Sequence, residues 1–155
     1  MKAIVTIGVP ASGKSTYAHE IISKDPSYIE LNRDNIRCEL FGINGWTEYE
    51  FTEENERKVT TEQYDRIRAA SNEGKNLILT DTNLKMKYIR SLLSLLEHFG
   101  YNVYIKICDI TLIEAVRRNH ERSVGIKAER LHIQYNQFME TKKRVESRYG
   151  HYLTS

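Results

Sequence analysis

The sequence holds few of the residues that mark secreted, membrane-spanning or disordered proteins. Its 155 residues include two cysteines, two prolines and one tryptophan. Cys38 and Cys108 are too few for a disulfide framework and lack metal-ligand spacing, so we expect two reduced thiols in a cytoplasmic protein. No run approaches the roughly 18 consecutive apolar residues that a transmembrane helix needs. We therefore expect no membrane partner.

An excess of one charge is also missing. The 23 basic and 21 acidic residues leave a net charge of +2, which excludes a protein that binds nucleic acid through bulk charge alone. Any such role must come from a local basic cluster. The composition, 40% hydrophobic and 28% charged, is that of a soluble globular chain. Its length predicts one domain over residues 1–155 and leaves the oligomeric state open.

Short apolar runs typical of strands alternate along the chain with longer segments whose apolar residues recur at helical spacing. The β-branched run at 2–7 leads into a glycine-rich loop, so we interpret it as a first strand and not as a signal peptide. Such alternation favours right-handed crossovers and a parallel sheet, with ligands bound at the carboxyl ends of its strands. The remaining strands are predicted at 27–31, 77–80 and 102–107, and helices at 14–24, 35–41, 52–70, 85–99, 111–121 and 128–148.

The strongest functional signal lies between the first strand and the first helix. Residues 8–15, GVPASGKS, match the P-loop pattern G-x-x-x-x-G-K-[ST] in its strand-to-helix context. In such a loop the backbone N–H groups surround phosphate. Lys14 is expected to bridge the β- and γ-phosphates of ATP or another NTP, and the Ser15 hydroxyl to ligate Mg²⁺. We expect nucleotide contacts from Gly8, Pro10, Ala11, Ser12, Gly13, Lys14, Ser15 and Thr16.

This motif, together with the alternating elements, predicts the fold. We expect an α/β protein with the P-loop NTPase or kinase fold. It would have three layers, with a four-stranded parallel sheet flanked by helices, and a helical lid.

Acidic and basic side chains follow the second predicted strand. Asp34 lies where an acceptor would enter beside the P-loop, and a carboxylate there can take the proton of a hydroxyl group as a general base. Arg37 is three residues further, so it shares a helix face with Asp34 and can hold an anion near the same hydroxyl. The alternative is structural: Asp34 as the helix N-cap and Arg37 as a solvated surface residue.

Asp81 directly follows the third predicted strand, LILT. This is the position of a Walker-B acid, which either holds Mg²⁺ or orients the acceptor and its arginine. Asn83 adds a neutral polar group to the same edge. The alternative for Asp81 is an ordinary turn aspartate.

Two arginines near the carboxyl end form a second basic pair. Arg118 and Arg122 are four residues apart, which places them on one side of a predicted helix. The stretch 123–125, which follows them, is predicted to be a flexible hinge. Paired guanidinium groups on a lid can neutralise the γ-phosphate in the transition state. A solvated basic helix face explains the same spacing.

Two weaker patterns remain. The loop 42–51 carries Trp46 and Tyr49 and ends at Phe51, and these rings either stack on nucleobases or fix the loop to the domain. The basic run 142–144, together with Arg148, is typical of a solvated helix face, with a nucleic-acid contact as the alternative.

Four segments together resemble the 5′-kinase domain of phage polynucleotide kinase-phosphatase. They occur in matching order and span most of the chain. The P-loop alone is generic, whereas the N-R-D-x-x-R and D-T-N patterns at these spacings are much more specific. The segments are TIGVPASGKST at 6–16, LNRDNIR at 31–37, LTDTN at 79–83 and VRRNHER at 116–122.

The resemblance implies a role for each matching side chain. Asp34 would be the general base on the 5′-hydroxyl of DNA or RNA, and Arg37 would contact the phosphate 3′ of the accepting nucleoside. Asp81 would support that acceptor site, with Asn83 beside it. Arg122 would be the lid arginine on the donor phosphates, assisted by Arg118, while Lys14 and Ser15 hold phosphate and Mg²⁺.

One departure is clear. Better-known members of that family carry a carboxyl-terminal phosphatase domain with an aspartate-rich motif, which this sequence lacks. We therefore expect either a kinase that stands alone or a truncated chain, without 3′-phosphatase activity.

The sequence hypothesis is thus an ATP- and Mg²⁺-dependent polynucleotide 5′-hydroxyl kinase of nucleic-acid repair, in the host cytoplasm if phage-encoded. A P-loop kinase of small-molecule hydroxyl groups and a nucleotide-gated binding module that is not an enzyme are the alternatives.

Overall fold

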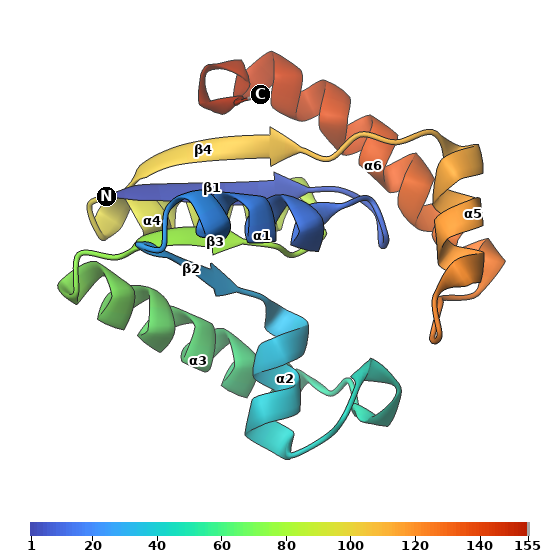
Figure 1. The fold of residues 1–155 in the computed structure, drawn as a ribbon, viewed down its shortest axis with the longest axis horizontal. Helices are drawn as coiled ribbons and strands as arrows, with labels where there is room; N and C mark the ends of the chain where they lie inside the picture. The colour runs from blue at the N-terminus through green and yellow to red at the C-terminus, as the bar shows by residue number, and fades with distance from the viewer. Residues whose placement is uncertain (155) are drawn as a thin grey trace.

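The core of the protein is a parallel sheet, as Figure 1 shows for the computed structural model, which describes residues 1–154. Within these residues the sheet has four strands in the order β2-β3-β1-β4. Ala3 of the central strand aligns with Leu77 on one side and with Val103 on the other. The predicted four-stranded parallel sheet is therefore confirmed. The strands are β1 (Lys2–Ile7), β2 (Tyr28–Leu31), β3 (Asn76–Leu79) and β4 (Asn102–Ile107).

Helices and short 3₁₀ turns connect and follow the strands. Their bounds fall within a few residues of those that the apolar periodicity predicts. The 3₁₀ turns η1 and η2 are additions that the sequence did not indicate. The elements are α1 (Lys14–Lys24), α2 (Arg33–Phe41), η1 (Trp46–Glu48), α3 (Glu53–Asn72), α4 (Met86–His98), α5 (Leu112–Glu121), α6 (Ala128–Arg148) and η2 (Gly150–Tyr152).

Helices cover both faces of the sheet. On one face α1 packs through Ala18 against Ile4 and Ile78. On the other face, α3, α4, α5 and α6 contribute to a larger core in which Phe138 and Leu77 are fully buried. In Figure 1 α1 lies in front of the strands and α4 behind them. The molecule has the predicted three layers.

The spacing of apolar residues explains why α4 forms. Ile89, Leu92, Leu93 and Leu96 recur at intervals of three and four residues, so all four side chains fall on one face and are buried. None of the helices within residues 1–154 is long and apolar enough to cross a bilayer.

The parallel arrangement brings all four carboxyl ends of the strands to one edge. In Figure 1 this edge is flanked by α2 on one side and by α5 with the start of α6 on the other. The polar segments that follow the strands in the sequence meet there, so this edge carries the candidate site.

Candidate active site

The loop between β1 and α1 has a backbone that glycine makes possible. Gly13 has φ +98°, in the left-handed region, and Ala11 has φ +65°. A side chain at Gly8 would clash with the Ser12 hydroxyl and would lie 3.1 Å from the Cβ of Cys108. Helix α1 has no side-chain cap at its N-terminus. Its first backbone N–H groups are therefore available to an anion.

Lys14 is buried at the centre of this loop. Its side-chain Nζ donates hydrogen bonds to the carbonyl oxygens of Val9 (2.7 Å) and Gly8 (3.1 Å). Burial lowers the pKa of Lys14 to about 8, although nearby acids, Asp81 and Asp34 among them, act in the opposite direction. The hydrogen-bond partners of the ammonium group are thus atoms of the loop itself, and the two carboxylates act on it only through their charge.

The donor set suits Mg²⁺ better than a metal that needs a closed cage of protein ligands. Ser15 is exposed on the first turn of α1. Among residues 1–154, no group of three or more His, Cys, Asp or Glu side chains gathers as a metal site would. Mg²⁺ commonly keeps several waters and binds through one or two protein groups and phosphates, so a single hydroxyl beside a phosphate loop fits it.

Asp34 is not the N-cap of α2, and that prediction is wrong. The chain is still extended at Asn32, which takes the cap position, and the Asn32 side-chain oxygen accepts a hydrogen bond from the Asn35 N–H (3.1 Å). Asp34 lies one step further, in the first turn of α2. Its side chain is 59% exposed, and its Oδ1 accepts a hydrogen bond from Nη1 of Arg37 (2.7 Å). The carboxylate is thus free of a capping role.

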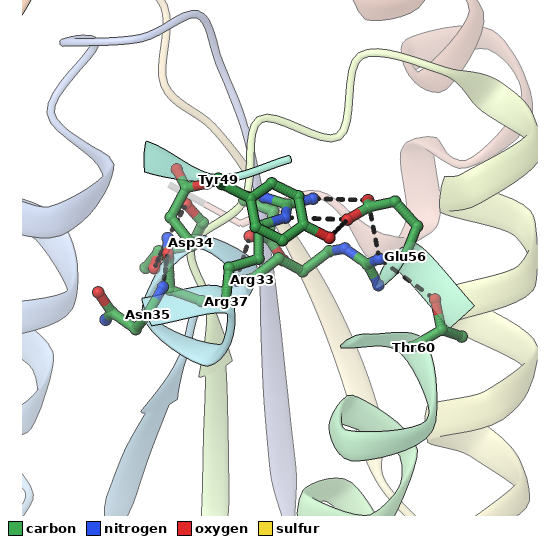
Figure 2. A network of polar contacts seen from close by, with 10 residues as sticks. Arg33, Asp34, Asn35, Arg37, Tyr49, Glu56 and Thr60 are labelled. Carbon is green, nitrogen blue, oxygen red and sulfur yellow. Dashed lines mark hydrogen bonds and ion pairs between the residues drawn. The ribbon is translucent and has the colours of Figure 1, made fainter. Parts of the chain in front are cut away.

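Arg37 is held in place by Glu56, as Figure 2 shows. Glu56 accepts hydrogen bonds from Nε (3.1 Å) and Nη2 (2.8 Å) of Arg37, and from the hydroxyl of Tyr49 (2.6 Å). Nη2 of Arg33 lies 3.3 Å from the same carboxylate. The Arg37 side chain is only 12% exposed, so the solvated surface alternative is wrong.

The charge of Glu56 depends on this arrangement. Burial on its own would raise the pKa of Glu56, but hydrogen bonds from Arg37 and Tyr49 outweigh it and hold the pKa at about 2. The sequence did not identify Glu56. Its only signal was an acid in the first turn of α3, which the helix dipole already explained.

Glu56→Ala is expected to lower the free energy of unfolding by about 1–3 kcal/mol, because it leaves the mostly buried Arg37 side chain without its main partner. Because the pKa of Glu56 falls on folding, its stabilisation is complete above its unfolded pKa of 4.5 and is lost as pH falls towards 2. Urea titrations at pH 7 and pH 3 measure both effects. Glu54→Ala is the control, since Glu54 is 79% exposed on the same helix. Equal losses in the two variants would contradict this account.

Asp81 links the end of β3 to the start of α2. Its Oδ1 accepts a hydrogen bond from the backbone N–H of Arg33 (2.8 Å). Burial raises the pKa of Asp81 to about 6, against the lowering effect of that N–H group. Asp81 is therefore more than an ordinary turn aspartate. Asn83 has φ +49°, and its amide nitrogen donates to the carbonyl of Thr6 (2.8 Å), so this nitrogen is bound within the protein.

Arg118 and Arg122 do not share a helix face, and that prediction is wrong. Helix α5 ends at Glu121, and Arg122 is extended (ψ 144°). Arg118 reaches the P-loop, where its Nη1 donates to the carbonyl of Ala11 (3.2 Å), while Glu114 accepts from its Nε (2.8 Å). Arg122 is exposed, but its charge contributes to the low pKa of Lys14.

Asn119 explains why α5 ends where it does. Its side chain exchanges two hydrogen bonds with the backbone of Ile126 (2.8 and 2.9 Å) and closes the following loop. A Cβ on Gly125 would lie 2.5 Å from the Asn119 carbonyl oxygen, so glycine is required there. The stretch 123–125, which we expected to be a flexible hinge, is thus fastened at its far end.

The weaker patterns are only partly resolved. Tyr49 fixes the loop to the domain, because its ring is 8% exposed and its hydroxyl binds Glu56. Trp46 and Phe51 stay 39% and 61% exposed. In the basic run of α6, Lys142 pairs with Asp109 (2.5 Å).

Comparisons with known proteins identify the family and the fold of the chain. A family model described as an AAA domain matches residues 4–147. A protein of Autographa californica nuclear polyhedrosis virus, named as a bifunctional polynucleotide kinase/RNA ligase, is 27% identical over 146 residues. The match covers 88% of this chain but 20% of the viral protein.

Solved structures show the same fold. A chain of the Pnkp1/Rnl/Hen1 RNA repair complex matches with a TM-score of 0.80 and 22% identity, over 92% of this chain and 45% of that one. A gluconokinase from Sinorhizobium meliloti 1021 matches with a TM-score of 0.59 and 18% identity, over 88% of this chain and 74% of the gluconokinase. The predicted P-loop kinase fold is confirmed, and the chain spans under half the length of the repair protein.

Proposed function

Since this chain belongs to the AAA domain family and has a P-loop kinase fold, we propose that it is a polynucleotide 5′-hydroxyl kinase. It transfers the γ-phosphate of ATP to the 5′-hydroxyl end of DNA or RNA. The observation that carries the proposal is the Asp34–Arg37 pair, joined at 2.7 Å, which follows β2 at the same edge of the sheet as the phosphate loop that follows β1. The likeness to a protein named as a polynucleotide kinase supports it.

The donor side consists of the P-loop and its basic neighbours. The backbone N–H groups that follow Pro10 in the loop, with those at the start of α1, surround the β- and γ-phosphates. Lys14 turns its ammonium group from the loop carbonyls of Gly8 and Val9 to phosphate oxygens. Arg118, next to Ala11, and Arg122 balance charge that develops during transfer. Ser15 would hold Mg²⁺, which when bound neutralises phosphate charge.

The acceptor side consists of the residues after β2 and β3. Asp34 accepts the proton of the 5′-hydroxyl as that oxygen forms a bond to the γ-phosphorus, and the bond from phosphorus to the bridging oxygen breaks to release ADP. Arg37 binds the phosphate 3′ of the accepting nucleoside. Asp81 keeps the start of α2 in register with the P-loop through Arg33.

Nucleotide binding is expected to weaken at high pH. The pKa of Lys14 is about 8 in the free protein, and bound phosphate favours the ammonium form. Between pH 7 and pH 9 the Kd for ATP should therefore rise roughly tenfold, because binding must first restore a proton. Calorimetric titration at several pH values measures this slope, the dependence of the Kd for ATP on pH. Lys14→Arg, which stays charged, should abolish it, and a slope unchanged in that variant would assign the effect to another group.

Transfer of labelled γ-phosphate to a panel of alcohols tests the proposed function. We expect label on 5′-hydroxyl oligonucleotides and not on 5′-phosphorylated ones. Label confined to gluconate or other small alcohols would favour a small-molecule kinase. Nucleotide binding without any labelled acceptor would favour a nucleotide-gated binding module.

A further inference from the structure

Phe51 is an exposed aromatic side chain beside the candidate acceptor site. Phe51 is 61% exposed, yet its ring contacts two other side chains. The Tyr49 ring meets it edge-on, with centroids 4.6 Å apart, and the Arg37 guanidinium lies 5.1 Å from its centroid. Arg37 in turn donates to Asp34. Only one side chain therefore separates Phe51 from the proposed general base.

The backbone around Phe51 is also fixed. Thr52 caps α3 through a side-chain hydrogen bond from the Asn55 N–H (3.1 Å). The Asn55 amide donates to the carbonyl of Glu50 (2.9 Å). Both neighbours of Phe51 are thus anchored to the start of α3. The exposed ring therefore belongs to an ordered segment. Covering a large apolar ring with a second flat surface removes apolar area from water and is favourable.

We propose that Phe51 stacks on the nucleobase of the terminal nucleotide of the acceptor strand. The inference rests on the proposed function and adds a subsite to it. Because Phe51 lies against Arg37, and Arg37 against Asp34, a nucleoside with its 5′-hydroxyl at Asp34 and its 3′-phosphate at Arg37 would have its base within reach of Phe51. The arginine charge over the ring and the 61% exposure of Phe51 suit a flat aromatic ligand.

Stacking of this kind has a consequence for specificity. Every base has a π-face, so an aromatic platform without base-edge contacts tolerates any sequence. Phe51 therefore favours a nucleotide over a small alcohol without selecting which nucleotide. The kinase is expected to accept all four bases at the 5′ end with similar KM values.

The test compares Phe51→Ala with the unchanged protein on two acceptors. One is an oligonucleotide with a normal 5′ nucleotide, and the other has an abasic 5′ nucleotide. For the normal acceptor we expect KM to rise roughly tenfold or more in the variant, with a smaller change in kcat. On the abasic acceptor both proteins should have equally high KM values, because there is no base for Phe51 to contact. Phe51→Trp should restore binding of the normal acceptor.

Trp46, the single tryptophan, provides a second readout. It lies in the same loop, so its fluorescence is expected to change when a normal acceptor is added and to change less with Phe51→Ala. Tyr88→Ala is the matched control, because Tyr88 is a 55% exposed aromatic residue on α4 and should leave both acceptors unaffected.

Two results would overturn the inference while the proposed function stands. An equal rise in KM on normal and abasic acceptors would mean that Phe51 supports the loop and not a base. No rise on either would mean that the ring is not used. Phe51→Leu, which keeps an apolar side chain against Tyr49, replaces the alanine variant if that variant fails to fold. By contrast, absence of transfer from the unchanged protein to any oligonucleotide would contradict the proposed function itself.

Discussion

Asp34→Asn is expected to lower kcat for phosphate transfer about 10²–10⁴-fold while the Kd for ATP stays unchanged. The amide has nearly the shape of the carboxylate, and its oxygen can still accept the hydrogen bond from Nη1 of Arg37. It cannot accept the proton of the incoming alcohol. Since the Asp34 side chain is 59% exposed and does not cap α2, the free energy of unfolding should not change measurably.

Single-turnover kinetics with saturating ATP measure the loss from Asp34→Asn at the chemical step. Asp65→Asn is the control, because Asp65 is an exposed aspartate on α3, outside the site. Turnover of Asp34→Asn within about threefold of the unchanged protein would mean that another group takes the proton. A weaker Kd for ATP would mean instead that Asp34 acts on the donor side.

Lys14→Met is expected to lower kcat about 10²–10³-fold and to weaken ATP binding as well, because it removes a positive charge that interacts with both ground state and transition state. Methionine fills a similar volume. Loss of the buried ammonium removes its desolvation cost but leaves the carbonyl oxygens of Gly8 and Val9 without this donor. The fold should therefore survive, which thermal unfolding checks.

The control for Lys14→Met is Lys24→Met, because Lys24 is exposed at the end of the same helix. That variant should keep the kcat and the ATP affinity of the unchanged protein. If Lys14→Met bound ATP and transferred phosphate like the unchanged protein, the loop at 8–15 would not be the nucleotide site.

The parts of the site within one sequence motif were predictable. The P-loop combines a strand, a glycine-dependent turn and a helix start within a few residues, so spacing alone specifies how Gly13 and Lys14 lie. The edge of the sheet was also predictable, because parallel strands align their carboxyl ends. Both therefore follow from local pattern and topology.

The prediction of helix ends failed where the local sequence allows more than one end point. Asn32 and Asp34 are both good cap residues, and the choice between them depends on whether the helix begins at Arg33 or two residues later, at Asn35. The error at Arg122 is similar. A helical pattern continues past Glu121, but the Asn119 side chain captures the backbone of Ile126 and ends the helix.

Glu56 could not be found from the sequence for a different reason. It lies 19 residues from Arg37, and only tertiary packing of α2 against α3 brings the two side chains together. No periodicity or motif encodes such a contact. The residue that fixes the acceptor-side arginine is therefore visible only in the structure (Figure 2).

The most direct test of the central claim is a structure of the protein with a non-hydrolysable ATP analogue and a 5′-hydroxyl oligonucleotide. The account predicts the γ-phosphate in the loop at 8–15, with the 5′ oxygen about 2.6–3.2 Å from the Asp34 carboxylate and in line with the scissile bond. A 5′ end bound elsewhere, or an Asp34 carboxylate that remains paired only with Arg37 and turned from the hydroxyl, would contradict it.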